Sequence, residues 1–289
     1  MTPAGHAGIK AGAAGQLNVL PAFSYPKASV LFCDAERASL GVFRRVGDRM
    51  VCEHLASAAL PQTRAEAGFQ STPELVATLA SLRSEAAARE PLVLLLPSHL
   101  SLCKHLRLPR VDARKRAKLA SFEAAQKLPC PLTEVVWDTV SAGGDAASQE
   151  LVLAAVRTTV MLPWCEAVAA AGFRLQQVVP FPLALLAGCR RAHRFSAEPA
   201  LVLHVGAKAA TLLLADASRF AVRTWLLAPE AEQAGNTERL AQEITRSVLH
   251  LRAEGSLGDP RLLLLAGETT VRLCDAVLLA SRLDVPVRA

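Results

Sequence analysis

Short apolar runs alternate with longer amphipathic segments along this chain, and their order predicts an α/β fold. In the first part of the chain, the runs Ser29–Asp34, Ser39–Phe43, Met50–Ala58 and Leu92–Leu96 have the length and apolar character of strands. A helix begins at Thr72, with a proline in its first turn and its leucines on one side. The predicted order is three strands, a helix and a fourth strand.

The middle of the chain predicts a second group of elements around one basic helix. Asp112 has the side chain of a helix N-cap, and the helix runs to Leu128, where a Pro-Cys-Pro run ends it. Helical periodicity places four residues on its inner face: Ala117, Phe122, Ala125 and Leu128. The predicted neighbours of this helix are the strands His99–Leu108, Val135–Val140, Leu151–Val156 and Leu175–Val179 and the helix Met161–Ala171.

The last third of the chain repeats the pattern of the first. After a helix that begins at Pro182, two apolar strands form a predicted hairpin around Gly206, and a third strand follows. A long amphipathic helix, a buried strand and a final helix complete the repeat. The predicted elements are the strands Leu201–Val205, Thr211–Ala215, Arg219–Leu227 and Arg261–Leu265 and the helices Thr237–Ala253 and Thr269–Arg282.

Composition narrows the classes of protein that fit. Hydrophobic residues make up 52% of the 289 residues and aromatic residues only 4%, so the core must consist of Leu, Val and Ala. No apolar run in the sequence approaches the roughly 20 residues that span a bilayer. Residues 1–28 lack the continuous apolar core of a signal peptide, and we expect them to form a flexible leader. Seven cysteines without close pairs fit free thiols in a reducing cytoplasm.

The net charge of +6 is concentrated where the basic helix starts. The cluster comprises Arg107, Arg110, Arg114, Lys115, Arg116 and Lys118. Such a cluster is most often a solvated helix face. Its functional interpretation is a surface for an acidic partner segment or for anionic lipid headgroups, with Arg110, Arg114, Lys115 and Lys118 as the contact residues. Nucleic acid is not expected as a partner, because no aromatic residues interleave with the charges.

Three stretches around the basic helix resemble a known family. Gln126–Val135 reads Gln-Lys-Leu-Pro-Cys-Pro-Leu-Thr-Glu-Val, a helix end followed by a Pro-x-Pro-Leu-x-Glu run and a strand. Leu153–Arg157 and Ala171–Leu175, on either side of a helix, supply a strand end and an Ala-Gly-Phe turn. In these features the chain resembles PilM proteins, and the resemblance extends from Ala28 to Val287. PilM proteins are actin-like assembly factors of type IV pili, related in fold to the cell-division protein FtsA.

The resemblance implies an α/β, actin-like (ribonuclease H-like) fold of two halves. We expect residues 29–98 to form the first half, 99–180 a small α+β subdomain inserted into it, and 181–289 the second half. PilM proteins usually carry a second small subdomain before the long helix of the second half, and in actin-like proteins it forms one wall of the nucleotide cleft. Only Ala228–Asn236 is available here, so we expect that subdomain to be missing or minimal.

Actin-like ATPases hold phosphate with glycine-bearing hairpin turns, and the first such turn is altered here. The motif should read Gly-x-Asp-x-Gly-Ser-Ser, because glycine lets the backbone approach a phosphate. Asp34 matches the aspartate and Ser39 remains a candidate contact, but Phe32 and Glu36 replace the two glycines. A carboxylate at position 36 would repel a triphosphate.

The two other turns are altered as well. In the Asp-x-Gly-x-x-x-Thr motif, Gly206 and Thr211 are kept, but His204 replaces the aspartate. Lys208 is a candidate phosphate contact, although a lysine at an exposed hairpin tip is the more common case. Neutral histidine is a poor magnesium ligand. The third motif keeps only Gly267 of its Gly-Gly pair. The remnant nucleotide site therefore consists of Asp34, Ser39, Gly206, Lys208, Thr211 and Gly267. We expect no cofactor, with ATP and magnesium bound only if this remnant still functions.

No other catalytic or metal-binding motif is predicted. The seven histidines show no metal-ligand spacing with one another or with cysteine, and neither a P-loop nor a Gly-x-Ser-x-Gly element occurs.

The sequence thus predicts a binding scaffold. By resemblance, it would be a cytoplasmic protein that is held at the inner membrane through its partners, in a type IV pilus or a related secretion machine. It would bind the cytoplasmic tail of a PilN-type membrane protein in a groove between the first half and the insertion. The cytoplasmic domain of the GspL type, from type II secretion, is the related alternative, and the oligomeric state is open.

Two other interpretations remain. An active actin-like ATPase or sugar-kinase-type phosphotransferase would need Asp34, Lys208 and Thr211 to act on phosphate despite the lost glycines. An unrelated α/β protein would lack the two repeated three-strand openings.

Overall fold

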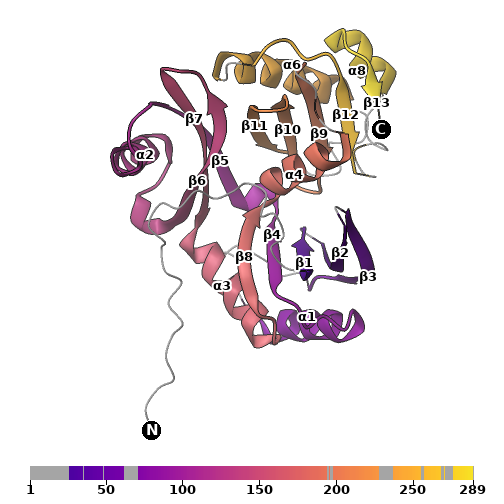
Figure 1. Cartoon of the computed structure of the whole chain (residues 1–289). Coiled ribbons are helices and arrows are strands. Elements are labelled where there is room, and N and C mark those ends of the chain that lie inside the picture. Colours follow the sequence, from indigo (N-terminus) through magenta and orange to yellow (C-terminus); the bar gives the residue numbers. More distant parts are fainter. Residues whose placement is uncertain are drawn as a thin grey trace.

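The computed structural model describes residues 26–34, 36–47, 49–61, 71–193, 195, 198–227, 237–254, 257–267, 270 and 276–288. Most of the predicted leader and the short link 228–236 lie outside the described residues. The described chain forms two five-stranded sheets and one three-stranded sheet (Figure 1).

The two larger sheets have the same strand order and the same strand directions. The first sheet has the order β3-β2-β1-β4-β8 and the second β11-β10-β9-β12-β13. In each, three antiparallel strands are followed by two strands parallel to the first. The predicted internal repeat is therefore confirmed. The strands of the first sheet are β1 Lys27–Cys33, β2 Arg37–Val46, β3 Arg49–Ala59, β4 Leu92–Leu96 and β8 Leu175–Pro180. Those of the second are β9 Ala200–Val205, β10 Ala209–Ala215, β11 Phe220–Leu226, β12 Leu263–Ala266 and β13 Val287–Arg288.

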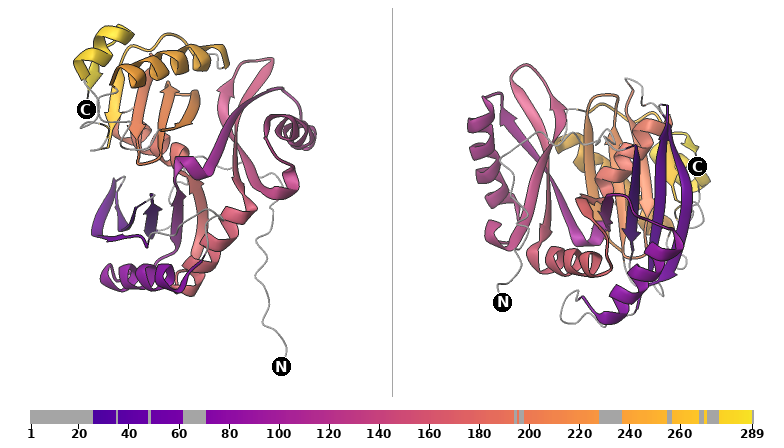
Figure 2. Two further views of the ribbon diagram at one scale, coloured as in Figure 1. Left: turned by 180° about the vertical axis from the view of Figure 1, so that it is seen from behind. Right: turned by 60° about the horizontal axis from the view of Figure 1, so that its bottom comes forward.

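Helices cover both sheets and separate them. On the outer face of the first sheet lie α1 (Pro73–Glu85) and α3 (Thr158–Ala170), and on that of the second lie α6 (Thr237–Glu254) and α8 (Ala276–Leu283) (Figures 1 and 2). Between the two sheets lies α4 (Phe181–His193), which contacts strands of both. Each outer layer buries an aliphatic core, as the low aromatic content requires.

The start of α1 forms as its sequence predicts. The hydroxyl of Thr72 caps the helix by accepting a hydrogen bond from the Leu75 amide at 3.2 Å. Leu75, Leu79 and Leu82 follow at helical spacing and are fully buried against the first sheet.

The insertion is a three-stranded sheet with the order β5-β7-β6, formed by β5 (Ser101–Pro109), β7 (Ser148–Arg157) and β6 (Val135–Gly144). One face of this sheet packs on α2 (Ala113–Lys127). The other face packs on α4 and on strands of the second sheet. The insertion, which interrupts the first half in sequence, is therefore anchored to the second half in space.

The predicted inner face of α2 is wrong at Phe122 and Ala125, which are exposed, whereas the predicted Leu128 is buried. Its N-cap is confirmed, since the Asp112 carboxylate accepts a hydrogen bond from the Lys115 amide at 3.0 Å. However, Ala120 and Ala124 face the sheet, whereas Phe122 exposes 61% of its surface. Small alanines let the helix approach the sheet closely while its many cations stay in water, and this arrangement turns the phenylalanine outward.

Two predicted boundaries also change. The strand β8, expected within the insertion, pairs with β4 and belongs to the first sheet, so the inserted sheet ends at Arg157. A strand's apolar character does not reveal which strand it pairs with. The strand predicted over Val135–Val140 continues as β6 through Gly143 and Gly144, with φ of +118° and +131°, and the turn begins at Asp145. The short edge strand β13 was not predicted.

Candidate functional site

The turns predicted to hold nucleotide approach one another between the two sheets. His99, in the short 3-10 helix Ser98–Leu100, lies among them. Burial lowers the pKa of His99, the charge of Lys208 lowers it further, and the charge of Asp34 acts in the opposite direction. Lys208 of the second half and Asp34 of the first half therefore both lie within electrostatic range of one side chain.

The Asp34 carboxylate is bound by its own turn. One of its oxygens accepts hydrogen bonds from the amides of Glu36 and Arg37, both at 2.7 Å. The backbone amide of Asp34 also donates a hydrogen bond to the Arg37 carbonyl at 3.0 Å. In a phosphate-binding turn, free amides of this kind point at the ligand. Here the carboxylate of Asp34 accepts the hydrogen bonds of these two amides.

Two hairpin turns elsewhere in the molecule have the same geometry. The Asp145 carboxylate accepts hydrogen bonds from the amides two and three residues later at 2.9 and 2.7 Å, and the Asp216 carboxylate does so at 2.8 and 2.6 Å. All three turns begin with an Asp-Ala pair in the sequence. Because the Asp145 turn lies at the tip of the insertion, this arrangement is a general way of closing a hairpin in this chain. The repeated Asp-Ala pair is the sequence signal that would have revealed it.

The second turn contains His204 and Gly206. His204, which replaces the motif aspartate, is largely buried, and burial lowers its pKa. It therefore stays a neutral imidazole near neutral pH and offers no negative charge to magnesium. Gly206 closes the turn with a 2.9 Å hydrogen bond from its amide to the Ala209 carbonyl.

Gly267 packs against the same histidine. Its φ is +90°, and a Cβ atom there would lie 3.2 Å from Cδ2 of His204. The glycine is required both by its backbone conformation and by the close approach of the imidazole ring. It supports the packing of His204 and does not present a free backbone edge.

Three rings join the halves across this region, and we call Phe32, Phe181 and His204 the aromatic bridge. The ring centroids of Phe32 and Phe181 lie 4.8 Å apart, and those of Phe181 and His204 lie 4.5 Å apart. Phe32 belongs to β1, His204 to β9, and Phe181 is the first residue of α4. The sequence motifs identified Phe32 and His204 as replacements of a motif glycine and a motif aspartate. They did not identify Phe181, because only the fold places its ring between the other two.

Ser39 and Thr211 are also engaged in internal contacts. The hydroxyl of Ser39 lies 2.8 Å from that of Ser57 on the neighbouring strand β3. Thr211 is fully buried, and its hydroxyl lies 2.7 Å from that of Ser98. The Ser98–Thr211 hydrogen bond connects the start of the insertion to the second sheet.

Three of the motif side chains have contacts within the protein. The Asp34 carboxylate accepts hydrogen bonds from two backbone amides. The second motif has a neutral imidazole at position 204, and the Thr211 hydroxyl is buried. Lys208 is the remaining candidate contact, on an exposed turn. Among the described residues, no group of three or more His, Cys, Asp or Glu side chains could hold a metal ion.

The buried thiols are poor nucleophiles. Burial raises the pKa of the Cys103 thiol to about 12 and that of Cys189 to about 11. Burial also raises the pKa of Cys33 on β1 well above its usual range. These thiols stay protonated at neutral pH, and only the thiolate reacts readily.

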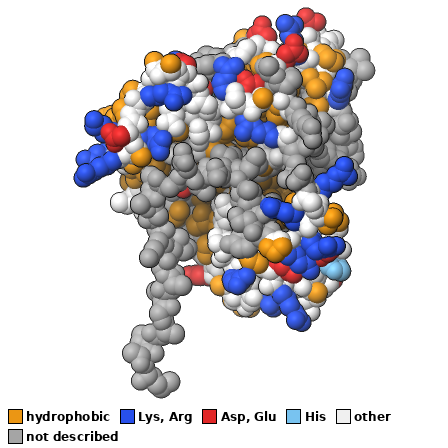
Figure 3. Space-filling model, viewed as in Figure 1, with side chains coloured by type: hydrophobic (Ala, Val, Ile, Leu, Met, Phe, Trp, Pro, Cys, Tyr) orange, Lys and Arg blue, Asp and Glu red, His pale blue; other side chains and the backbone are white. Residues whose placement is uncertain are grey.

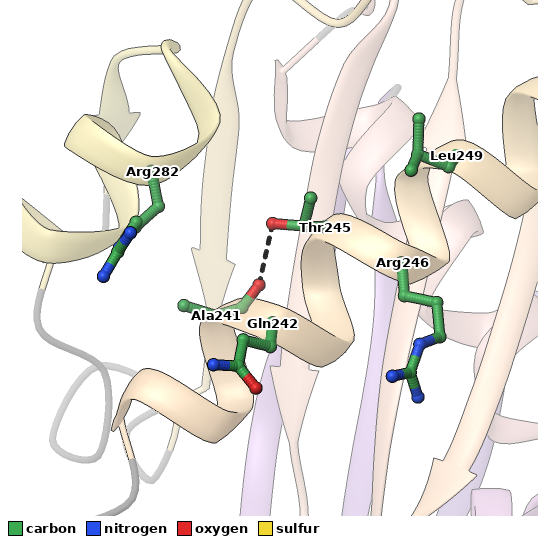
Figure 4. A pocket seen from close by; sticks show the side chains of 6 residues that line it. All are labelled: Ala241, Gln242, Thr245, Arg246, Leu249 and Arg282. Atoms are coloured by element: carbon green, nitrogen blue, oxygen red, sulfur yellow. Dashed lines mark hydrogen bonds between the residues drawn. The ribbon is translucent and has the colours of Figure 1, made fainter.

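A surface cavity of about 470 Å³ lies between α6 and α8, away from these turns (Figure 4). Its lining consists of Ala241, Gln242, Thr245, Arg246, Leu249 and Arg282. The Thr245 hydroxyl donates to the carbonyl of Ala241 within the same helix, so it does not point a free donor into the cavity. The cavity contains none of the residues predicted to bind nucleotide or partner.

The predicted partner-binding cations divide into two groups. Arg110 donates to the backbone carbonyl of Asp145, and so helps to hold the tip of the insertion. Arg114, Lys115 and Lys118 lie on α2 and are exposed. Figure 3 shows Lys and Arg side chains at the left edge of the molecule, where α2 lies in Figure 1.

Comparison with known proteins identifies the fold. The sequence matches no protein-family model and no curated protein. The structure is similar to that of a PilM–PilN type IV pilus biogenesis complex, with a TM-score of 0.69 and 21% identity over 90% of this chain and 87% of that chain. It is also similar to the cytoplasmic domain of EpsL, an inner-membrane component of the type II secretion system of Vibrio cholerae. That match has a TM-score of 0.52 and 12% identity over 83% of this chain and 81% of the other.

A third similar structure is a Bacteroides thetaiotaomicron protein with an actin-like ATPase fold and unknown function. It matches with a TM-score of 0.56 and 9% identity over 94% of this chain and 93% of that chain. The actin-like fold predicted from the sequence is thus confirmed, and the predicted resemblance to PilM is confirmed at the level of structure. None of the described helices is long and apolar enough to cross a membrane.

Proposed function

We propose that this protein is a scaffold on the cytoplasmic side of a type IV pilus or related secretion machine, and that it does not hydrolyse ATP. The observation that carries the proposal is the Asp34 turn, in which the protein's own carboxylate takes the hydrogen bonds that a phosphate would need. The aromatic bridge supports it, because two of its rings, Phe32 and His204, stand at the positions of a motif glycine and a motif aspartate. The similarity to the PilM–PilN structure gives the kind of machine.

The partner would be the cytoplasmic tail of a PilN-type membrane protein. An exposed sheet edge suits an extended tail, and β6 forms such an edge of the inserted sheet, bonded to β7 alone. Val136 near the start of β6 and Leu162 on α3 are exposed to 41% and 47%. Both lie where the insertion meets the first half, so an apolar residue of the tail would find contacts there.

Calorimetry on the purified protein tests both parts of the proposal. Magnesium-ATP at near-millimolar concentration should give no heat of binding, whereas a peptide with the tail sequence of the PilN-type partner should bind. Micromolar ATP binding that Asp34→Ala abolishes would overturn the first part and support an active ATPase. A tail peptide that gives no heat would overturn the second part.

A variant locates the tail. Leu162→Glu should weaken binding of the tail roughly tenfold, because it places a charge among apolar contacts. Leu249→Glu is the matched control, since Leu249 on α6 is also exposed, to 60%, but belongs to the second half. Equal affinities of the two variants would place the tail elsewhere.

A further inference from the structure

The outward face of α2 has an aromatic residue at its centre. Successive residues of an α-helix are rotated by about 100°, so Phe122 lies about 180° from the midpoint between Ala120 and Ala124. Those two alanines are buried against the inserted sheet, and Phe122 exposes 61% of its surface. Its ring thus points directly away from the inserted sheet, and no packing among the described residues accounts for its position.

Cations flank this ring. Lys115 and Lys118 lie within about 40° of Phe122 around the helix axis, and Arg114 lies about 40° beyond Lys118. The Lys115 ammonium is 3.7 Å from the Asp112 carboxylate, but both side chains are exposed, so the attraction between them is weak. In the described part of the chain, no carboxylate lies within ion-pair distance of Arg114 or Lys118. The positive charge of this face is therefore largely uncompensated.

This segment carries the net charge of the whole protein. Between Lys104 and Lys127 there are eight Lys or Arg residues and two Asp or Glu residues, which gives a net charge of +6. The entire chain, with 32 basic and 26 acidic residues, has the same net charge of +6. The remainder of the protein is thus neutral overall. The helix α2 itself has five basic residues and one acidic residue, so it carries +4 of this charge.

The helix lies at the periphery of the molecule. It covers the side of the inserted sheet that faces away from the two larger sheets (Figures 1 and 2). Its outward face is therefore convex and accessible to a large flat partner. A peptide would instead need a groove or a sheet edge to bury its side chains.

We propose that this face of α2 binds the surface of a membrane rich in anionic phospholipids, with Phe122 entering the headgroup region. Each basic residue near such a surface increases the affinity of the protein for the membrane roughly fivefold. An aromatic side chain adds apolar contact with the lipids. This inference goes beyond the scaffold role, because the protein contacts the bilayer itself as well as the tail of a membrane-protein partner. Direct contact would orient the insertion toward the bilayer.

Sedimentation with lipid vesicles tests the proposal in the absence of any protein partner. The wild-type chain should bind vesicles of phosphatidylcholine with about 30% phosphatidylglycerol and not vesicles of phosphatidylcholine alone. About 0.5 M NaCl should release it, since salt screens exposed charges. Equal binding to both vesicle types, or to neither, would overturn the proposal.

Variants locate the contact on α2. The double substitution Lys115→Gln and Lys118→Gln should lower the partition coefficient roughly 25-fold, because two charges are removed. The matched control, Arg49→Gln with Arg174→Gln, removes two exposed charges outside α2 and should change binding much less. Equal losses in the two double variants would show a general effect of net charge and would contradict the assignment to α2.

Phe122 has its own test. Phe122→Ser should weaken binding roughly tenfold, whereas Leu55→Ser, at a position on β3 that is 72% exposed, should leave it unchanged. In Phe122→Trp, lipids brominated on their acyl chains should quench the added fluorescence if the side chain enters the bilayer. Absence of quenching, or tight binding of an acidic peptide with no binding of vesicles, would reject the membrane and favour a protein partner. Failure of the tail peptide to bind would leave these vesicle results unaffected, so the two proposals are separately testable.

Discussion

Polar and aromatic side chains have partners within the protein in one region and are exposed to solvent in another. Between the sheets, where an actin-like ATPase holds its nucleotide, the Asp34 carboxylate, the Thr211 hydroxyl and the Phe181 ring all have partners within the protein. On the outer face of α2, the cations and Phe122 are exposed. The groups between the sheets therefore stabilise the fold, whereas the exposed groups of α2 remain accessible to a partner.

The largest expected effect is a difference in the free energy of unfolding between a variant of each region. Phe181→Ala should lower the free energy of unfolding by about 3 kcal/mol, because it removes the central ring of the aromatic bridge. Phe122→Ala should change it by less than about 0.5 kcal/mol, because that ring is mostly in water. Chemical denaturation of both variants measures the difference, and similar losses would contradict the contrast between the regions.

The buried hydrogen bond between the halves comes next. Thr211→Val should cost about 2 kcal/mol, because it leaves the Ser98 hydroxyl buried without its partner. Adding Ser98→Ala should cost less than the sum of the two single substitutions, since both polar groups are then gone. A double-mutant cycle by denaturation measures this coupling, and strict additivity would show that the contact contributes little.

A smaller effect is expected at the aspartate turns. Asp34→Ala should cost about 1 kcal/mol, because two amides of the turn lose their acceptor. Asp145→Ala should also lower stability, since the geometry of its turn is the same. Thermal unfolding compares the two variants. An effect of Asp34→Ala that appears only in the presence of nucleotide would instead point to a functional role for that carboxylate.

The smallest effect concerns pH. Burial lowers the pKa of His204 below its ordinary value of 6.5, so the unfolded chain takes up a proton more readily than the folded one. Stability from this group is full above about pH 6.5 and falls as the pH drops below that value toward the lowered pKa. Between about pH 7.5 and pH 5.5, the wild type should lose up to about 1 kcal/mol more than His204→Gln. Parallel pH profiles would show that His204 does not titrate in this way.

Local signals in the sequence predicted most of the elements. The helix start at Thr72, the cap at Asp112 and the alternation of apolar runs and amphipathic segments are properties of neighbouring residues, and these predictions were confirmed. The actin-like fold followed from the resemblance to PilM proteins together with the three-strand opening that occurs twice.

The errors arose where distant residues decide the outcome. The pairing of β8 with β4 depends on a contact across the whole insertion. The rotation of α2 depends on how closely the sheet lets the helix approach, and its own periodicity fits two faces. For the candidate site, the sequence identified the altered turns, but the positions of Phe181 and Ser98 between them are set by the fold.

The burial of Cys33 supplies a native reporter of local opening. This thiol lies at the end of β1, directly before the Asp34 turn, and none of its surface is exposed. An alkylating reagent reaches it only when the β1–β2 hairpin separates from the core, so its labelling rate measures the free energy of that excursion. Cys52 on β3 is exposed and reacts without opening. The ratio of the two rates would therefore measure, in the intact protein, how tightly the β1–β2 hairpin is held to its core when a partner binds.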